Sequence, residues 1–142
     1  ENVSPEFDKC RQRISNLLRE ESQLLEIVKL IGSDILPEDQ KLTMEIARVI
    51  RLGFLQQNAY HEIDTYVPLQ KQLKMMQTIL RLYDGVKVAV DKAVPLSQFT
   101  ATGVFDSLVK MKYELPNDDL SGFARYEQEI DAALEKVHAA NS

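Results

Sequence analysis

The sequence is poor in cysteine and glycine and lacks tryptophan, with one cysteine and five glycines among 142 residues. Cys10, the single cysteine, has no partner for an internal disulfide, which is typical of proteins from the reducing cytosol. No run of roughly 18 or more apolar residues occurs, so we expect no segment that inserts into a membrane. The opening segment, Glu1 to Phe7, lacks the basic and apolar regions of a signal peptide. These absences predict a cytoplasmic protein.

An initiator methionine is also absent, because the chain begins at Glu1. We interpret the chain as an interior segment excised from a longer protein. Its length suits one domain, and its 44% hydrophobic and 27% charged residues are close to the averages of soluble globular domains. We therefore expect residues 1–142 to form a single domain.

There is no excess of positive charge. The 17 lysines and arginines are outnumbered by 22 aspartates and glutamates, which gives a net charge of −5 and a pI near 5.1. Proteins that bind DNA or RNA neutralise phosphates with clustered lysines and arginines. The composition therefore predicts no nucleic-acid partner.

The closely spaced glycines of phosphate-binding loops are missing as well. Such loops present backbone amides through positions that glycine tolerates best, whereas these glycines stand far apart, at positions 32, 53, 85, 103 and 122. Metal-ligand spacing is also absent, since Cys10, His61 and His138 match neither H-x-x-x-H nor C-x-x-C. We therefore predict no catalytic residue, no phosphate site and no metal site in this chain.

The sequence does contain a repeated helical pattern. Apolar residues recur three or four apart, the spacing of amphipathic helices, in a first segment from Phe7 to Ile31 and a second from Leu42 to Phe54. A third runs from Pro68 to Val90, a short fourth carries Phe105, Leu108 and Val109, and a last one reaches Val137. No strand pattern of period two competes with them. The sequence predicts an all-α fold, an antiparallel helical bundle of about five helices.

Glycine and proline mark the expected helix ends. Gly32 would end the first helix in a left-handed conformation, while Pro37 and Pro68 would open the second and third helices in their first turns. Pro95 would end the third and Pro116 the fourth. Thr100 or Thr102 would cap the fourth helix, and Asn117 or Asp118 would precede the last.

The helical pattern stops between Gln57 and Val67, which we interpret as an ordered loop. His61 stands beside Glu62 and close to Asp64, and the three could form an acid–base cluster. Neighbouring residues on a loop usually point apart, however, so a hydrogen-bonded loop histidine is the simpler interpretation.

Aromatic and amide side chains gather at the same place, in Phe54-Leu55-Gln56-Gln57-Asn58-Ala59-Tyr60 and Asp64-Thr65-Tyr66. Such a set could stack on a planar ring and hydrogen bond to it. The structural alternative is that Phe54 and Tyr66 anchor the loop to the bundle.

These two runs, followed by Lys71-Gln72 and Met75-Met76, resemble the C-terminal region of the catalytic A subunit of archaeal and vacuolar-type rotary ATPases. The same family pattern is matched by Leu25-Glu26-Ile27-Val28-Lys29-Leu30-Ile31-Gly32, by Ile35-Leu36-Pro37-Glu38-Asp39-Gln40 and by Met111-Lys112-Tyr113. The resemblance extends from about Phe7 to the last helix, nearly the whole chain.

The resemblance implies a larger protein. The full subunit of this family has an N-terminal β-barrel, a nucleotide-binding domain and a helical C-terminal domain, and this chain resembles only the last. The phosphate-binding lysine, the catalytic glutamate and the magnesium ligands would all lie upstream. ATP or ADP with Mg²⁺ would therefore be bound by the full subunit, whose reaction is ATP synthesis or hydrolysis coupled to proton or sodium transport, and this fragment alone would be inactive.

The resemblance also implies a site and partners. Tyr60 would take the aromatic position against adenine, with Gln57, Asn58 and Ala59 nearby. The expected partners are the upstream nucleotide-binding domain, the B subunits and the central-stalk rotor subunits, in a cytoplasmic complex peripheral to the membrane. A rigid bundle would act as a lever that passes movement at the nucleotide to the rotor.

Two other functions compete with this one. The chain could be a free-standing helical module that binds partner helices through its exposed faces. It could also be a small helical enzyme that uses His61 and Glu62, which the loop position of these residues disfavours.

Overall fold

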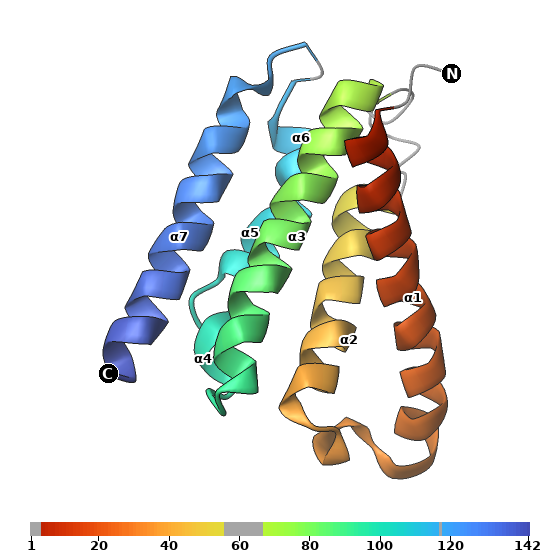
Figure 1. Ribbon diagram of the computed structural model, residues 1–142, viewed down its shortest axis with the longest axis vertical. Helices are drawn as coiled ribbons and strands as arrows, with labels where there is room; N and C mark the ends of the chain where they lie inside the picture. The colour runs from red at the N-terminus through yellow and green to blue at the C-terminus, as the bar shows by residue number, and fades with distance from the viewer. Residues whose placement is uncertain (1–3, 56–66, 117) are drawn as a thin grey trace.

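The computed structural model describes residues 4–55, 67–116 and 118–142, and in these ranges it contains helices and no strand (Figure 1). The four long helices are α1 (Pro5–Ile31), α2 (Glu38–Ile50), α3 (Leu69–Asp91) and α7 (Phe123–Ala140). Three short helices lie between α3 and α7, namely α4 (Ser97–Thr100), α5 (Val104–Val109) and α6 (Met111–Glu114). The predicted all-α fold is confirmed.

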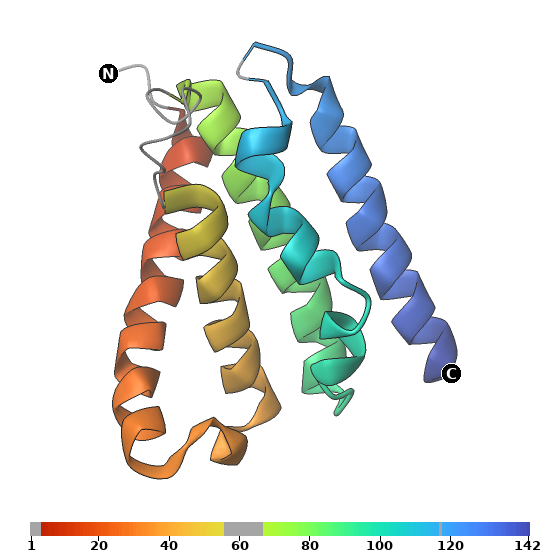
Figure 2. The same cartoon turned by 180° about the vertical axis from the view of Figure 1, so that it is seen from behind.

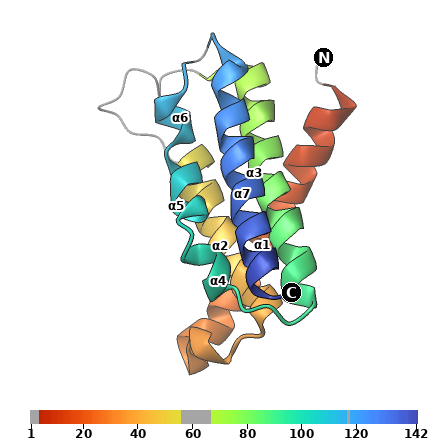
Figure 3. The ribbon, with the colours of Figure 1, turned by 90° about the vertical axis from the view of Figure 1, so that its left-hand side faces the viewer.

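The first three long helices run in alternating directions. In Figure 1, α1 descends, α2 returns beside it, α3 descends next to both, and α7 descends on the far side of α3. The short helices α4, α5 and α6 climb along the opposite face, where α5 packs between α2 and α7 (Figures 2 and 3). The tip of the α1–α2 hairpin therefore lies at one end of the bundle, and α6 and the start of α3 lie at the other.

The core forms where the apolar stripes of these helices meet. Leu42, Ile46 and Ile50 of α2 are fully buried against α3 residues such as Met75 and Ile79. Aromatic side chains fill the space between α3, the short helices and α7: Phe99, Phe105, Phe123 and Tyr126 are each at most 1% exposed. Burying each large side chain contributes about 1.5–3 kcal/mol to folding, so this continuous cluster makes the helices move as one packed body.

The helix ends follow the local signals, with small shifts. Ser4 caps α1 by accepting a hydrogen bond from the Phe7 N–H, and Gly32 ends it with φ 89°. Pro37 and Pro68 stand at the N-cap positions of α2 and α3, one residue before the predicted first turns. The helix α3 continues unbroken through Gly85.

Two of the expected elements differ from the structure. The second helix was predicted to run to Phe54, but α2 ends at Ile50 and the chain continues as a π-helical turn, Arg51–Leu55. The predicted fourth helix is divided at Lys110 into α5 and α6, and α4 forms ahead of it, in a stretch where no helix was predicted. The N-cap residue of α5 is Gly103, at φ 84°, rather than the predicted Thr100 or Thr102, although the Thr102 hydroxyl oxygen accepts a hydrogen bond from the Val104 N–H.

The last helix begins later than predicted. Asp119 accepts a hydrogen bond from the Ser121 N–H and so opens a 3₁₀ turn, Leu120–Gly122. The helix α7 then starts at Phe123, whereas the sequence placed its start directly after residue 117 or 118. Before this turn, Leu115 is extended, as expected of a residue that precedes a proline.

Candidate functional site

The predicted adenine-side residues Gln57, Asn58, Ala59 and Tyr60 lie outside the described residues, as do His61, Glu62, Asp64 and Tyr66. The structure does describe the two stems that bracket them. The N-terminal stem is the π-helical turn Arg51–Leu55, and the C-terminal stem is residues 67–72. Both stems pack on one pair of short helices, which we call the α5–α6 arm (residues 104–115).

The N-terminal stem approaches the arm at Gly53, which is buried. A Cβ atom on this residue would lie 3.0 Å from the Leu108 carbonyl oxygen and 3.0 Å from the Val109 Cα. Because both atoms belong to the backbone of α5, a larger residue at this position would push the stem and the arm apart. The close contact therefore depends on glycine.

The N-terminal stem is also tied to α1. The Arg51 guanidinium donates two hydrogen bonds to the carboxylate of Glu21, whose side chain is only 6% exposed. Next to it, Phe54 packs partly buried against the core. The contact of Phe54 supports its interpretation as an anchor of the following segment, while Leu55 is left 49% exposed at the edge of that segment.

The C-terminal stem is held by Lys71, in the first turn of α3. Its side chain is fully buried, and its Nζ donates hydrogen bonds to the carbonyl oxygens of Lys112, at 2.9 Å, and Leu115, at 2.5 Å. Burial, and to a lesser extent the charge of Lys112, lowers the pKa of Lys71. Gln72 adds a 2.8 Å bond from its Nε2 to the Val67 carbonyl oxygen.

Sequence reasoning gave Lys71 no role. The residue belonged to one of the motifs that carried the family resemblance, but apolar periodicity counts a lysine as exposed. The only available signal was its place within three residues of Pro68, directly after the segment of interest. Its two partners among the described residues are backbone carbonyls, which no side-chain pattern reveals.

Exposed apolar residues gather at the opposite end of the bundle, at the turn between α1 and α2. Leu30 is 84% exposed, Ile35 60% and Ile31 54%, and Ile27 of the preceding turn is 41% exposed. We call these four residues the apolar tip. Ile31 is the last residue of the apolar pattern that predicted the first helix, and it is exposed because α1 extends beyond the core. Clustered exposed apolar side chains are typical of a contact surface.

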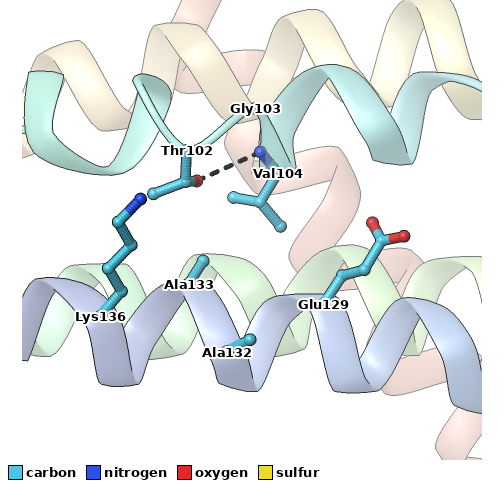
Figure 4. Close-up of a pocket in the computed structure, with 7 residues that line it drawn as sticks. All are labelled: Thr102, Gly103, Val104, Glu129, Ala132, Ala133 and Lys136. Atoms are coloured by element: carbon cyan, nitrogen blue, oxygen red, sulfur yellow. Dashed lines mark hydrogen bonds between the residues drawn. The ribbon is translucent and has the colours of Figure 1, made fainter.

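A pocket of about 270 Å³ lies between the start of α5 and α7 (Figure 4). Small side chains, Ala132 and Ala133, line its α7 side, with Glu129 and Lys136 at its two ends in this view. The Glu129 carboxylate accepts a 2.5 Å hydrogen bond from the Ser107 hydroxyl. The lining contains neither histidine nor cysteine.

Within residues 4–55, 67–116 and 118–142, no group of three or more His, Cys, Asp and Glu side chains is placed to hold a metal ion. None of the helices described is long and apolar enough to cross a bilayer.

The fold is that of an all-α bundle domain. The α5–α6 arm lies at one end of this bundle, and the apolar tip lies at the other. The family model for the C-terminal domain of V and A type ATP synthase matches residues 1–100. The chain belongs to this family. The resemblance noted in the sequence is thereby confirmed.

Individual relatives are also ATP synthase chains of the V and A types. The chain is 44% identical over 137 residues to the V-type ATP synthase alpha chain 2 of Clostridium tetani, which covers 96% of the chain and 23% of that protein. It is 43% identical over 119 residues to the A subunit of the A-type ATP synthase of Methanopyrus kandleri, covering 84% and 20%. The corresponding protein of Methanosarcina acetivorans is 46% identical over 114 residues, covering 80% and 20%. The chain thus spans less than a quarter of each of these relatives.

Proposed function

We propose that this chain is the C-terminal domain of the catalytic A subunit, or alpha chain, of a rotary ATP synthase or ATPase that transports protons or sodium ions. It closes the adenine side of the nucleotide pocket and passes movement at the nucleotide to the rotor. The family membership and the relatives named as ATP synthase chains support this role. The complex would lie on the cytoplasmic side as a peripheral part of a membrane enzyme.

One structural observation carries the proposal. The stems that bracket residues 56–66 are fixed at the α6 end of the bundle, while the apolar tip lies at the far end of the α1–α2 hairpin (Figure 1). A close-packed core joins the stems to α1 and α2, and the hairpin of these two helices carries the tip beyond it. Because packed helices move as rigid units, a small rotation at the stems becomes a larger displacement at the tip.

The phosphate chemistry is assigned to the rest of the parent protein. ATP or ADP with Mg²⁺ would bind an upstream nucleotide-binding domain, which supplies the groups that handle phosphate and metal. In this chain, Tyr60 would stack on adenine, with Gln57, Asn58 and Ala59 beside it. The B subunits and the central-stalk rotor subunits are the other partners.

The adenine role is tested by Tyr60→Ala and Tyr60→Phe in the assembled enzyme. Loss of a ring stacked on a base removes about 1–3 kcal/mol in single-stranded nucleic-acid complexes, so Tyr60→Ala is expected to raise the KM for ATP about ten-fold. Turnover at saturating ATP should fall much less, since the contact stabilises ground and transition states alike. Tyr60→Phe should match the unmodified enzyme. An unchanged KM in a folded, assembled Tyr60→Ala enzyme would make Tyr60 a loop anchor instead.

The rotor role is tested at the apolar tip. Leu30→Ser should lower the number of ions pumped per ATP hydrolysed, because the tip loses part of its apolar contact. Val88→Ser is the matched control, since Val88 is also apolar and exposed, at 57%, but lies on α3 away from the tip. Equal pumping efficiency in the two variants would contradict a rotor contact at the tip.

The same tip would also suit a free-standing module that binds partner helices. The two functions differ in what precedes residue 1. Extending the reading frame upstream of Glu1 distinguishes them. A nucleotide-binding domain encoded there supports the rotary ATP synthase, whereas a stop codon followed by a start codon at this domain supports the module.

A further inference from the structure

Another pocket, with a volume of about 370 Å³, lies between the C-terminal halves of α3 and α7. Gly85 and Ala89 stand one turn apart on α3, and both line this space. Because neither has a side chain larger than a methyl group, they leave room between two helices that otherwise pack together. Small-molecule sites typically have volumes of about 300–1,000 Å³, so this pocket suits a small ligand.

Much of the pocket wall is apolar. The Phe99 ring of α4 is 1% exposed, and Val137 of α7 is 4% exposed. Beside them, Ala89, Val94 and Leu134 are partly buried against the core. A hydrocarbon group that entered this space would be removed from water, which is favourable. The wall therefore suits the apolar part of a ligand.

The fold itself holds this wall in place. The Val94 N–H donates to the Ala89 carbonyl, 3.1 Å away, in the turn that ends α3. At the end of α7, the Asn141 Nδ2 donates to the Gln98 Oε1 of α4 across 2.7 Å. These bonds fix the turn after α3 and join α4 to α7. The pocket is therefore formed before a ligand binds, which lowers the entropic cost of binding.

Two exposed basic side chains also line the pocket, Lys92 at the C-cap of α3 and His138 in the last turn of α7. Both offset the negative ends of the two helix dipoles. Among the described residues, no hydrogen bond or ion pair engages either side chain, and no carboxylate side chain lines the pocket. An anionic group that accepts hydrogen bonds complements these two side chains.

We propose that this pocket binds a small amphiphilic carboxylate, such as a medium-chain fatty acid. The hydrocarbon chain lies on Phe99 and Val137, and the carboxylate accepts hydrogen bonds from Lys92 and His138. The site uses none of the residues to which the proposed function assigns a contact with adenine or the rotor. It can therefore be tested independently of that function.

The test uses the full-length subunit that carries this domain, with octanoate as the probe. Saturation-transfer NMR measures the Kd of octanoate and of octylamine, which has the same chain length and a cationic head group. Octanoate should bind more tightly than octylamine, because Lys92 attracts a carboxylate and repels an ammonium group. Octylamine binding as tightly as octanoate would overturn the proposal, as would an absence of octanoate binding.

The location of the site is tested by filling it. Ala89→Leu places a larger side chain in the space between α3 and α7 and should abolish octanoate binding. Ala124→Leu is the matched control, because Ala124 is exposed near the start of α7 and does not line the pocket. Octanoate binding that survives Ala89→Leu, or that is lost equally in Ala124→Leu, would place the probe elsewhere and overturn the proposal.

The role of the charge is tested by Lys92→Gln, which changes an exposed side chain and so remains decisive if Ala89→Leu does not fold. It should weaken octanoate binding by about three-fold to five-fold, as expected for an exposed charge pair. The Kd of uncharged octanol should not change. Lys110→Gln is the control, since Lys110 is also an exposed C-cap lysine but belongs to α5. An equal loss for octanoate and octanol, or equal effects of the two lysine variants, would overturn the assignment of the carboxylate to Lys92.

Discussion

The Glu38 carboxylate accepts a hydrogen bond from the Leu96 N–H across a 2.7 Å distance. Glu38 is the first residue of α2, and Leu96 immediately precedes α4, so the bond joins two turns separated by 58 residues of sequence. The other carboxylate oxygen lies 3.2 Å from the Lys41 Nζ. The Leu96 hydrogen bond, followed by Lys41, lowers the pKa of Glu38.

The first prediction concerns the acid stability of the 142-residue chain. A carboxylate whose pKa is lower in the folded state stabilises the fold above its unfolded pKa, near 4.3, and this contribution is lost as the pH falls through the lowered folded value. Glu38→Gln should therefore decrease the free energy of unfolding at pH 7 and weaken its dependence on pH below about pH 5. Urea denaturation at about pH 7, 5 and 3 measures both effects.

The control for this prediction is Glu26→Gln. Glu26 forms only an exposed pair with Lys29 among the contacts described, its side chain being 75% exposed, and such surface pairs contribute about 0–1 kcal/mol. Identical pH profiles for the two variants would show that the Leu96 bond does not stabilise the fold.

The second prediction concerns alkaline pH. Tyr126 is completely buried, and its hydroxyl donates to Glu114; burial, followed by this carboxylate, raises the pKa of Tyr126 to about 12. Because the folded pKa exceeds the unfolded value of about 10, the contribution is complete below that pH and is lost as the pH rises toward 12. Tyr126→Phe should lower the free energy of unfolding by about 1 kcal/mol at pH 7.

Tyr126→Phe should also flatten the alkaline part of the stability profile. Burial raises the pKa of Tyr83 as well. The proteins with tyrosine and with phenylalanine at position 126 are therefore compared with Tyr83→Phe present in both, which removes the contribution of Tyr83. Denaturation curves between about pH 8 and 11 provide the measurement. A profile as steep with phenylalanine at position 126 as with tyrosine would refute the assignment of this dependence to Tyr126.

The third prediction compares two glycines. A Cβ at Gly53 would stand 3.0 Å from backbone atoms of α5, which cannot move without shifting the arm; Gly53→Ala should therefore destabilise the chain by about 1–3 kcal/mol. At Gly85 the nearest atom, 2.5 Å away, is the Leu134 Cδ1 at the end of a flexible side chain. The better helix propensity of alanine, worth about 1 kcal/mol, offsets that displacement, so Gly85→Ala should be nearly neutral. Chemical denaturation measures the free energy of unfolding of both variants. A larger loss in Gly85→Ala than in Gly53→Ala would contradict the prediction.

The fourth prediction concerns the end of α3. Ala93 has φ 75°, and the bonds from the Val94 N–H to the Ala89 carbonyl and from the Ala93 N–H to the Val90 carbonyl form a Schellman motif. Glycine adopts this left-handed conformation without the strain that a Cβ causes. Ala93→Gly should raise the free energy of unfolding by about 1 kcal/mol. Ala101→Gly, at φ −66°, should instead lower it, and a loss in both variants would argue against strain at Ala93.

The helical class and most helix ends could be predicted from the sequence because their causes are local. Gly32 and the prolines at 37, 68 and 116 restrict the backbone of their own neighbourhoods, and the three-to-four spacing of apolar residues depends on one helix alone. The family pattern was equally readable in continuous runs of residues. The adenine-side role of Tyr60 stays a prediction.

Tertiary packing decided what those patterns left open. The π-helical turn replaces the end of the second predicted helix where Gly53 meets the backbone of α5, a segment distant along the chain. Ile31 continues the apolar stripe of α1, yet it is exposed because no described helix reaches beyond the hairpin turn. A charged lysine is expected to be exposed to water, yet Lys71 is buried, and the carbonyls of Lys112 and Leu115 that accept its hydrogen bonds are 41 and 44 residues away in the sequence. A residue's own chemistry sets the local conformation, whereas burial and exposure depend on which distant segment lies against it.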